Sequence, residues 1–112
     1  MARPDAPNRG DLIWLQVTPR AGREEAGQRP ALVISPRAYN EKVGLALVCP
    51  ITSHVKGYPF EVLLPAGLPV SGAILADQLK CLDWRARQAT LIGEAPPQVL
   101  IEALAKIATL VQ

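Results

Sequence analysis

The sequence has few of the residues that build metal sites. It contains two cysteines, Cys49 and Cys81, and one histidine, His54, without a Cys-x-x-Cys or His-x-x-x-His pair. A structural zinc site needs four such ligands at short spacings, so the sequence argues against one. Both cysteines lie in apolar segments, which predicts buried, reduced thiols instead of a disulfide.

Several catalytic motifs are missing as well. The sequence has no Gly-x-Ser-x-Gly, no phosphate-binding loop ending in Gly-Lys-Ser or Gly-Lys-Thr, and no dinucleotide-binding glycine pattern. A single histidine also excludes a two-histidine acid–base pair within one chain. Any nuclease chemistry must therefore rest on arginine, carboxylates and hydroxyls.

Long apolar runs and a large charge imbalance are also absent. No apolar run approaches the roughly 20 residues of a membrane helix, and Met1–Asp5 lacks the apolar core of a signal peptide, which predicts a cytoplasmic protein. A net charge of +2 is too small to establish a nucleic-acid partner. With 49% hydrophobic and 20% charged residues, we expect one globular domain over residues 1–112, with a loosely ordered arm at residues 1–9.

Short apolar segments separated by polar loops predict a mainly β fold. The expected strands cover residues 11–17, 30–34, 43–52, 60–64, 72–76, 78–82 and 89–92. Ser35-Pro36 predicts an N-cap and the start of a short helix that runs to about Lys42. A C-terminal helix is expected from Pro96-Pro97, with one apolar face formed by Leu100, Leu104, Ile107 and Val111. This order of elements predicts a small barrel-like β fold with helical additions.

Two residues stand where strands meet polar loops. Arg29 directly precedes the expected strand at residues 30–34, and Pro30 restricts it to an extended conformation. Thr52 ends the most apolar strand, so its hydroxyl is expected at a rim. By spacing alone, an exposed arginine and an ordinary strand threonine remain the simpler interpretations.

Four blocks in this order resemble the MazF/PemK family of toxin endoribonucleases, and especially its MazF branch. The blocks are Gly10-Asp11-Leu12-Ile13-Trp14, Ala26-Gly27-Gln28-Arg29-Pro30, Cys49-Pro50-Ile51-Thr52 with Lys56-Gly57-Tyr58-Pro59-Phe60, and Leu75-Ala76-Asp77-Gln78-Leu79-Lys80. No single block is specific, whereas the ordered set is. The resemblance implies an SH3-like (CcdB/MazF-type) β-barrel with a C-terminal helix.

The resemblance also implies a function. Such a protein is the toxin of a type II toxin–antitoxin module and cleaves single-stranded RNA, including mRNA, at specific sequences, without a ribosome, metal or other cofactor. Its products carry 2′,3′-cyclic phosphate and 5′-hydroxyl ends. The implied partners are a second copy of the chain and a cognate MazE-like antitoxin, whose flexible acidic tail occupies the RNA site.

The family's active-site arginine and threonine match Arg29 and Thr52. A planar guanidinium and a hydroxyl can both donate to the non-bridging phosphate oxygens on which charge builds during cleavage. Arginine is a poor base, because its pKa lies above about 12. We therefore expect Glu24, which matches a glutamate important in close relatives, to be the base or a partner of Arg29. A solvated loop carboxylate remains an equal alternative.

Other residues are expected to contact RNA. Lys56 matches the family's second loop, and the Gln78 amide can donate to and accept from a base edge. Arg20 and Arg23 add positive charge in the loop before Arg29.

Three further residues in these blocks receive smaller roles. Asp77 matches a position that is catalytic in the PemK-like branch, but it lacks that branch's neighbouring arginine, so we expect a supporting role. His54 stands where the family varies and is assigned no role. Trp14 is expected in the core.

Two other functions remain open. A CcdB-like gyrase-directed toxin would share the barrel but would not need Arg29 and Thr52. A noncatalytic small-barrel module would bind RNA without cutting it.

Overall fold

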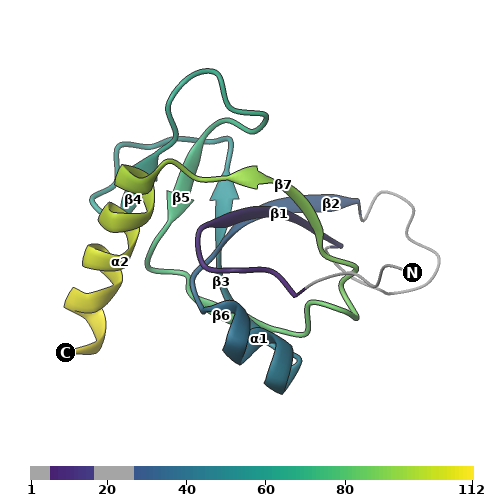
Figure 1. Cartoon of the computed structure of the whole chain (residues 1–112). Coiled ribbons are helices and arrows are strands. Elements are labelled where there is room, and N and C mark those ends of the chain that lie inside the picture. Colours follow the sequence, from purple (N-terminus) through teal and green to yellow (C-terminus); the bar gives the residue numbers. More distant parts are fainter. Residues whose placement is uncertain (1–5, 17–26) are drawn as a thin grey trace.

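The computed structural model describes residues 6–16 and 27–112. Each expected strand and helix has a counterpart in it (Figure 1). The elements are β1 Asp11–Gln16, β2 Gln28–Val33, α1 Arg37–Val43, β3 Ala46–Thr52, β4 Glu61–Leu63, β5 Ala73–Leu75, β6 Lys80–Leu82, β7 Thr90–Glu94 and α2 Pro97–Val111. The described chain is thus mainly β with two helices, as expected.

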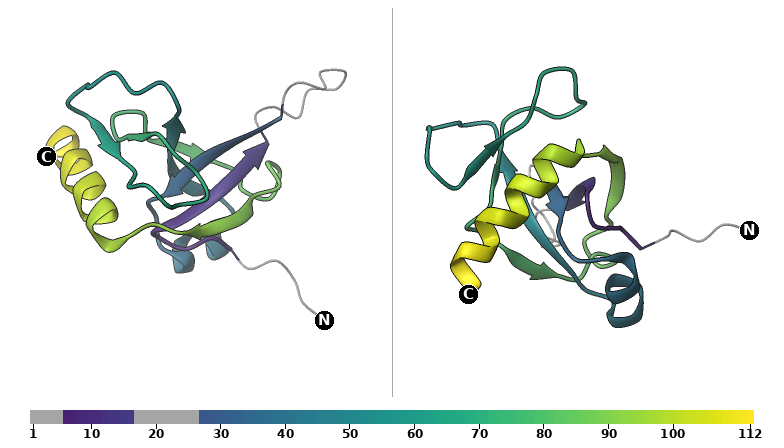
Figure 2. Two further views of the ribbon diagram at one scale, coloured as in Figure 1. Left: turned by 90° about the horizontal axis from the view of Figure 1, so that it is seen from above. Right: turned by 60° about the vertical axis from the view of Figure 1, so that its left-hand side comes forward.

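The strands form one antiparallel sheet in the order β4-β5-β3-β2-β1-β7, and β6 pairs with β3. β3 has neighbours along both edges. One edge pairs with β2, while the other pairs first with β6 at Ala46–Val48 and then with β5 at Ile51 and Thr52. In the described part of the chain, the outermost strands β4 and β7 do not pair, so the expected barrel is a curled but open sheet, with α1 and α2 on different sides (Figure 2).

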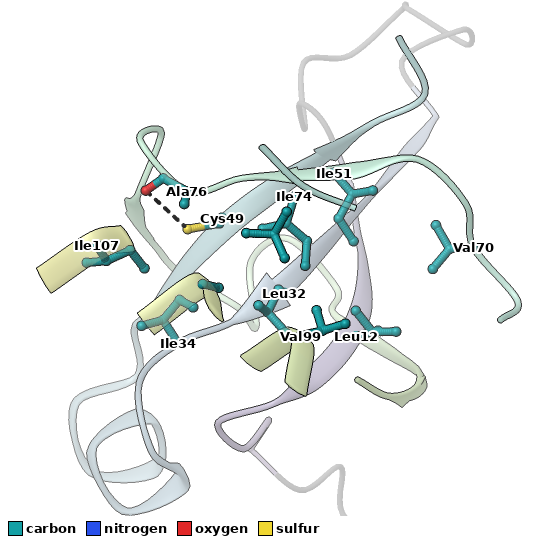
Figure 3. Close-up of a cluster of buried hydrophobic side chains, with 12 residues drawn as sticks. Leu12, Leu32, Ile34, Cys49, Ile51, Val70, Ile74, Ala76, Val99 and Ile107 are labelled. Carbon is teal, nitrogen blue, oxygen red and sulfur yellow. Dashed lines mark hydrogen bonds between the residues drawn. The ribbon is translucent and has the colours of Figure 1, made fainter. Parts of the chain in front are cut away.

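The main hydrophobic core lies between the curled sheet and α2 (Figure 3). Its buried residues are Leu12, Leu32, Ile34, Cys49, Ile51, Val62, Val70, Ile74, Ala76, Val99, Ala103 and Ile107. A second cluster contains Ile13, Val33, Val48 and Trp84. Burying each leucine or isoleucine contributes about 1.5–3 kcal/mol. β1, β2 and β3 contribute side chains to both clusters. Both faces of these strands are therefore apolar, and their sequences do not alternate cleanly between apolar and polar residues.

The apolar face of α2 differs from the expected one. Val99, Ala103 and Ile107 are buried, with Leu100 and Leu104 half-buried beside them. The assignment of Val111 to this face was wrong, since Val111 is 73% exposed. The last turn of α2 extends beyond the sheet (Figure 1). Among the described residues, no helix is long and apolar enough to cross a membrane.

Ser35 does not cap α1. The cap residue is Pro36, which makes no side-chain capping bond, and the first backbone N–H of the helix, that of Arg37, donates to Oδ1 of Asn8 at 2.9 Å. The Ser35 hydroxyl instead donates to Oδ1 of Asn40 and accepts the backbone N–H of Leu47 at 2.8 Å. It therefore joins α1 to β3. The expected strand at residues 43–52 begins only at Ala46, because the helix continues to Val43.

The arm before β1 is packed where it is described. Ala6 is buried, and the backbone N–H of Asn8 donates to Oδ2 of Asp11 at 2.8 Å. The fully buried Asn40 side chain donates to the carbonyl of Pro7, also at 2.8 Å. The expectation of a loose arm therefore fails for residues 6–9, because α1 provides partners for their backbone.

The two cysteines are free but differ in exposure. Cys49 is fully buried in β3, and its Sγ lies 4.0 Å from the Ala76 carbonyl (Figure 3). Burial, with a smaller effect of the Asp77 charge, raises the pKa of Cys49 to about 12. This thiol is therefore protonated and unreactive at neutral pH. Cys81 is exposed on β6, so its expected burial was wrong, because the short β6 only borders β3.

Glu61 holds the loop between β3 and β4. Only 7% exposed, its carboxylate accepts the backbone N–H groups of Lys56, Gly57 and Tyr58 at 3.0, 2.9 and 3.2 Å. The Lys56 N–H makes the largest contribution to lowering the pKa of Glu61 below its ordinary value of 4.5, and partial burial opposes this. The loop that carries Lys56 is therefore fixed by one ionised carboxylate.

We expect Glu61→Gln to destabilise the protein at pH 7, because the amide cannot accept these three bonds as an anion does. The pKa of Glu61 is lowered in the folded state, so its stabilisation is present above about pH 4.5 and disappears as pH falls through the folded-state pKa. Urea unfolding at several pH values should show a difference in the free energy of unfolding between wild type and variant that disappears in acid. Glu41→Gln, on the exposed face of α1, is the control. If this difference persists at pH 3, the charge of Glu61 is not its source.

Candidate active site

Arg29 lies within β2 instead of before it. The strand begins at Gln28, and Arg29 pairs with Leu15 of β1. Gly27, with a φ of 54°, turns the chain into the strand through the left-handed region that glycine favours. Arg29 is exposed, so a rigid strand carries a guanidinium that is open to solvent.

Thr52 is the last residue of β3. Half-buried, it pairs with Ala73 of β5, and its Oγ1 accepts the backbone N–H of His54 at 3.0 Å. The hydroxyl proton remains available for a ligand. Gly72 lies against this strand end with a φ of 120°, and a Cβ there would be 2.0 Å from the Thr52 carbonyl oxygen. Only glycine allows β5 to start so close to Thr52.

A cleft of about 660 Å³ brings Arg29 and Thr52 together. It is lined by Trp14, Arg29, Pro30, Pro50, Ile51, Thr52, Ser53, His54, Pro69, Val70, Ser71, Leu75, Gln78 and Lys80. The predicted RNA-contacting residue Gln78 therefore shares the cleft with the predicted catalytic pair. Among these described lining residues are two cations and a histidine but no carboxylate, which suits an anionic ligand.

Two smaller hollows continue the cleft. A pocket of about 210 Å³ shares Thr52, His54, Leu75 and Gln78 with the cleft and adds the exposed Lys56. A second pocket, of about 190 Å³, shares Arg29 and Lys80 with the cleft and adds Arg87. Basic side chains thus recur along a path from Arg87 through the cleft to Lys56, as binding of an extended polyanion requires, although Glu61 and Asp77 add two carboxylates to the 210 Å³ pocket.

Asp77 and Tyr58 face each other across the 210 Å³ pocket. The Tyr58 hydroxyl donates to Oδ2 of Asp77 at 2.7 Å, and this hydrogen bond is the main cause that raises the pKa of Tyr58. The other oxygen, Oδ1, is buried and has no hydrogen-bond partner among the residues that the structure describes. The Asp77 carboxylate therefore links the β5–β6 turn to the loop that carries Tyr58.

The other predicted site residues lie outside the described part of the chain. Glu24, Arg20 and Arg23 fall within residues 17–26. Their assignments as base and RNA contacts stay predictions. The described chain resumes at Gly27, two residues before Arg29.

Among the lining residues that were not predicted for the site, three carry an ionisable or aromatic side chain. His54 and Lys80 reach the cleft from the β3–β4 loop and from β6, and Trp14 lines it from β1 instead of being fully in the core. Lys80 lies two residues after Gln78, and this spacing, which places side chains on one side of an extended chain, was an available signal. Nothing in the sequence pattern distinguished His54.

No described residues form a metal site. Within residues 6–16 and 27–112, no group of three His, Cys, Asp or Glu side chains is arranged to hold a metal ion. The chemistry available in the cleft is hydrogen-bond donation and positive charge from Arg29 and Lys80, with hydroxyl donation from Thr52. Such groups stabilise a phosphate on which negative charge increases.

Comparison with known proteins gives matches over nearly the whole chain. Residues 8–111 match the family described as PemK-like, MazF-like toxin of type II toxin–antitoxin system. The chain is 50% identical over 105 residues to the endoribonuclease toxin MazF of Escherichia coli K12, covering 94% of each chain. It is 36% identical over 110 residues to the endoribonuclease toxin ChpB of the same strain, covering 93% of each.

Solved structures show the same fold. The MazF crystal structure (Form-I) from Deinococcus radiodurans is 55% identical with a TM-score of 0.84, covering 95% of this chain and 96% of that one. A MazE-MazF structure (Form-II) from that organism is 50% identical with a TM-score of 0.85, covering 95% of both chains. The match over nearly the whole chain, in sequence and in fold, shows that this protein belongs to the PemK-like, MazF-like family of toxins of type II toxin–antitoxin systems.

Proposed function

We propose that this protein is the endoribonuclease toxin of its module and cuts single-stranded RNA, including mRNA, at specific sequences without a ribosome or a metal ion. The observation that carries the proposal is the position of Arg29 and Thr52 on one cleft whose described lining has no carboxylate. The described lining therefore has no negative charge that would repel a phosphodiester. Hydrogen-bond donors and positive charge surround the place where the phosphodiester would bind.

The reaction that best fits these groups is attack of the RNA 2′-hydroxyl on the adjacent phosphorus. Charge then builds on the non-bridging oxygens, to which the Arg29 guanidinium and the Thr52 hydroxyl can donate. Glu24 remains the proposed acceptor of the 2′-hydroxyl proton. Because no described residues form a metal-binding group, the charge on the phosphate would be balanced by side chains.

The groove also suggests how the toxin is controlled. Related crystal structures from Deinococcus radiodurans contain MazE together with MazF. We infer that a cognate antitoxin binds here through an acidic segment, which is disordered alone and follows the basic path from Arg87 to Lys56. A homodimer would place two such paths on one surface.

The two other functions fit the cleft less well. A gyrase-directed toxin with this fold would not need an arginine and a threonine hydroxyl in one cleft. A noncatalytic RNA-binding module would need the basic path but not the Thr52 donor. Incubating the protein with a long RNA and mapping new 5′ ends separates these possibilities, because only the nuclease produces them.

Cleavage should require the ribose 2′-hydroxyl and not a divalent metal. We expect full activity in EDTA, and products with 2′,3′-cyclic phosphate and 5′-hydroxyl ends, identified by mass spectrometry. An oligonucleotide with one 2′-deoxyribose at the cleaved position should resist. Equal rates on this substrate and on all-RNA would disprove 2′-hydroxyl attack.

Loss of Arg29 should slow the chemical step more than it weakens RNA binding. Removing one charge-assisted donor costs roughly 3–4 kcal/mol, or two to three decades in rate. Arg29→Ala should show this loss in single-turnover cleavage, and Arg29→Lys should recover only part, because an ammonium cannot replace the guanidinium fork. Thr52→Val should cost a smaller factor, since it removes only the hydroxyl. Arg85→Lys, outside the cleft, is the control.

An acidic antitoxin segment should compete with RNA for the groove. A labelled RNA with 2′-deoxyribose at the cleavage site is displaced as unlabelled antitoxin tail peptide is added, and fluorescence anisotropy measures this displacement. Affinity for both should fall as salt rises, because both contacts are ionic. Simultaneous binding of RNA and peptide to one groove would contradict the proposed inhibition.

A further inference from the structure

We propose that His54 is the general acid of the cleavage reaction and protonates the departing 5′ oxygen. This inference rests on the proposed function and adds the group that completes its proton transfers. A 5′ alkoxide is a poor leaving group, so cleavage gains from an acid placed beside it.

The backbone holds His54 next to the proposed catalytic pair. Its N–H donates to Oγ1 of Thr52 at 3.0 Å, so residue 54 is fixed two positions beyond the end of β3. The side chain is exposed and lines both the 660 Å³ cleft and the 210 Å³ pocket. His54 therefore lies where the cleft with Arg29 meets the pocket with Lys56.

The other titratable groups among the described residues of these cavities are less suited to the task. They are Arg29 and Lys80 in the cleft, and Lys56, Tyr58, Glu61 and Asp77 in the pocket. Guanidinium and ammonium groups are much weaker acids than imidazolium. Glu61 accepts three N–H groups, which lower its pKa and favour its anionic form. The Tyr58 hydroxyl already donates a hydrogen bond to Asp77.

Imidazole fits by its chemistry, since it changes charge between about pH 5 and pH 8 and can give up a proton at neutral pH. The described charged groups that share its cavities are the cations Arg29, Lys80 and Lys56 and, in the pocket, the carboxylates of Glu61 and Asp77, which accept hydrogen bonds from neighbouring donors.

The proposed step balances without another reactant. O2′ forms a bond to phosphorus while the P–O5′ bond breaks, and O5′ keeps the electron pair of that bond. The imidazolium of His54 transfers its proton to O5′, which gives the 5′-hydroxyl product. The 2′-hydroxyl proton goes to the base, for which Glu24 is the candidate, and His54 regains a proton from water before the next turnover.

The first test is His54→Gln in the full chain, compared with Val55→Gln in the same loop, which lines neither cavity. Glutamine can still contact RNA but has no proton to transfer near neutral pH. We expect single-turnover cleavage to fall about 10²-fold, with little change in affinity for 2′-deoxy-substituted RNA. The wild-type rate should decline as pH rises through the imidazole titration, and the variant should lack this decline. Equal rates for variant and wild type would refute the proposal.

The second test uses an RNA whose bridging 5′ oxygen is replaced by sulfur, because a thiolate leaves without being protonated. On this substrate, His54→Gln should cut as fast as wild type, whereas Arg29→Ala should remain slow. If His54→Gln is equally impaired on both substrates, His54 binds or positions the RNA and is not the acid. If wild-type protein cuts neither substrate, the proposed nuclease function fails with it. Cleavage by the wild type, without rescue of the variant by sulfur, rejects only the role of His54.

Discussion

The architecture depends on the pairing of β3 along both of its edges. β2 occupies one edge, and β6 and β5 follow each other along the other, so the backbone of β3 is bonded on both sides. Its Cys49 and Ile51 side chains enter the main core, which anchors the strand against α2 (Figure 3). The position where β3 ends is therefore rigid, and Thr52 with the following loop is presented at a defined place.

Electrostatics then distinguishes the cleft from its surroundings. Arg29 and Lys80 line it without a carboxylate among the described lining residues. Two described carboxylates in the adjoining 210 Å³ pocket have partners of their own: Glu61 accepts three backbone N–H groups, and one oxygen of Asp77 accepts the Tyr58 hydroxyl. These bonds hold the loops, whereas Arg29 and Lys80 line the cleft itself. The same carboxylates would repel RNA if their loops did not supply donors.

Much of the fold could be predicted from the sequence, because local patterns carry it. The strands follow apolar segments, α2 follows Pro96-Pro97 and an apolar stripe, and the family resemblance is confirmed by the matching proteins. The predictions that were wrong share one cause, because in each case tertiary contacts override the local sequence pattern. Ser35 forgoes the cap of α1 because Asn40 and Leu47 are better placed partners. Val111 is exposed because the sheet ends before the helix does.

For the site, the sequence by itself determined the restricted backbone of Arg29, through Pro30, and a hydroxyl at the end of an apolar strand, through Thr52. Both are local properties, set by the neighbouring residues. Only the tertiary structure decided which other groups meet them. The turn between β5 and β6 brings Gln78 and Lys80 to the cleft, and the Thr52 hydroxyl holds the backbone of His54 beside it. These residues come together because strands that are distant in the sequence pair with each other, and such pairing leaves no periodic signal in the sequence.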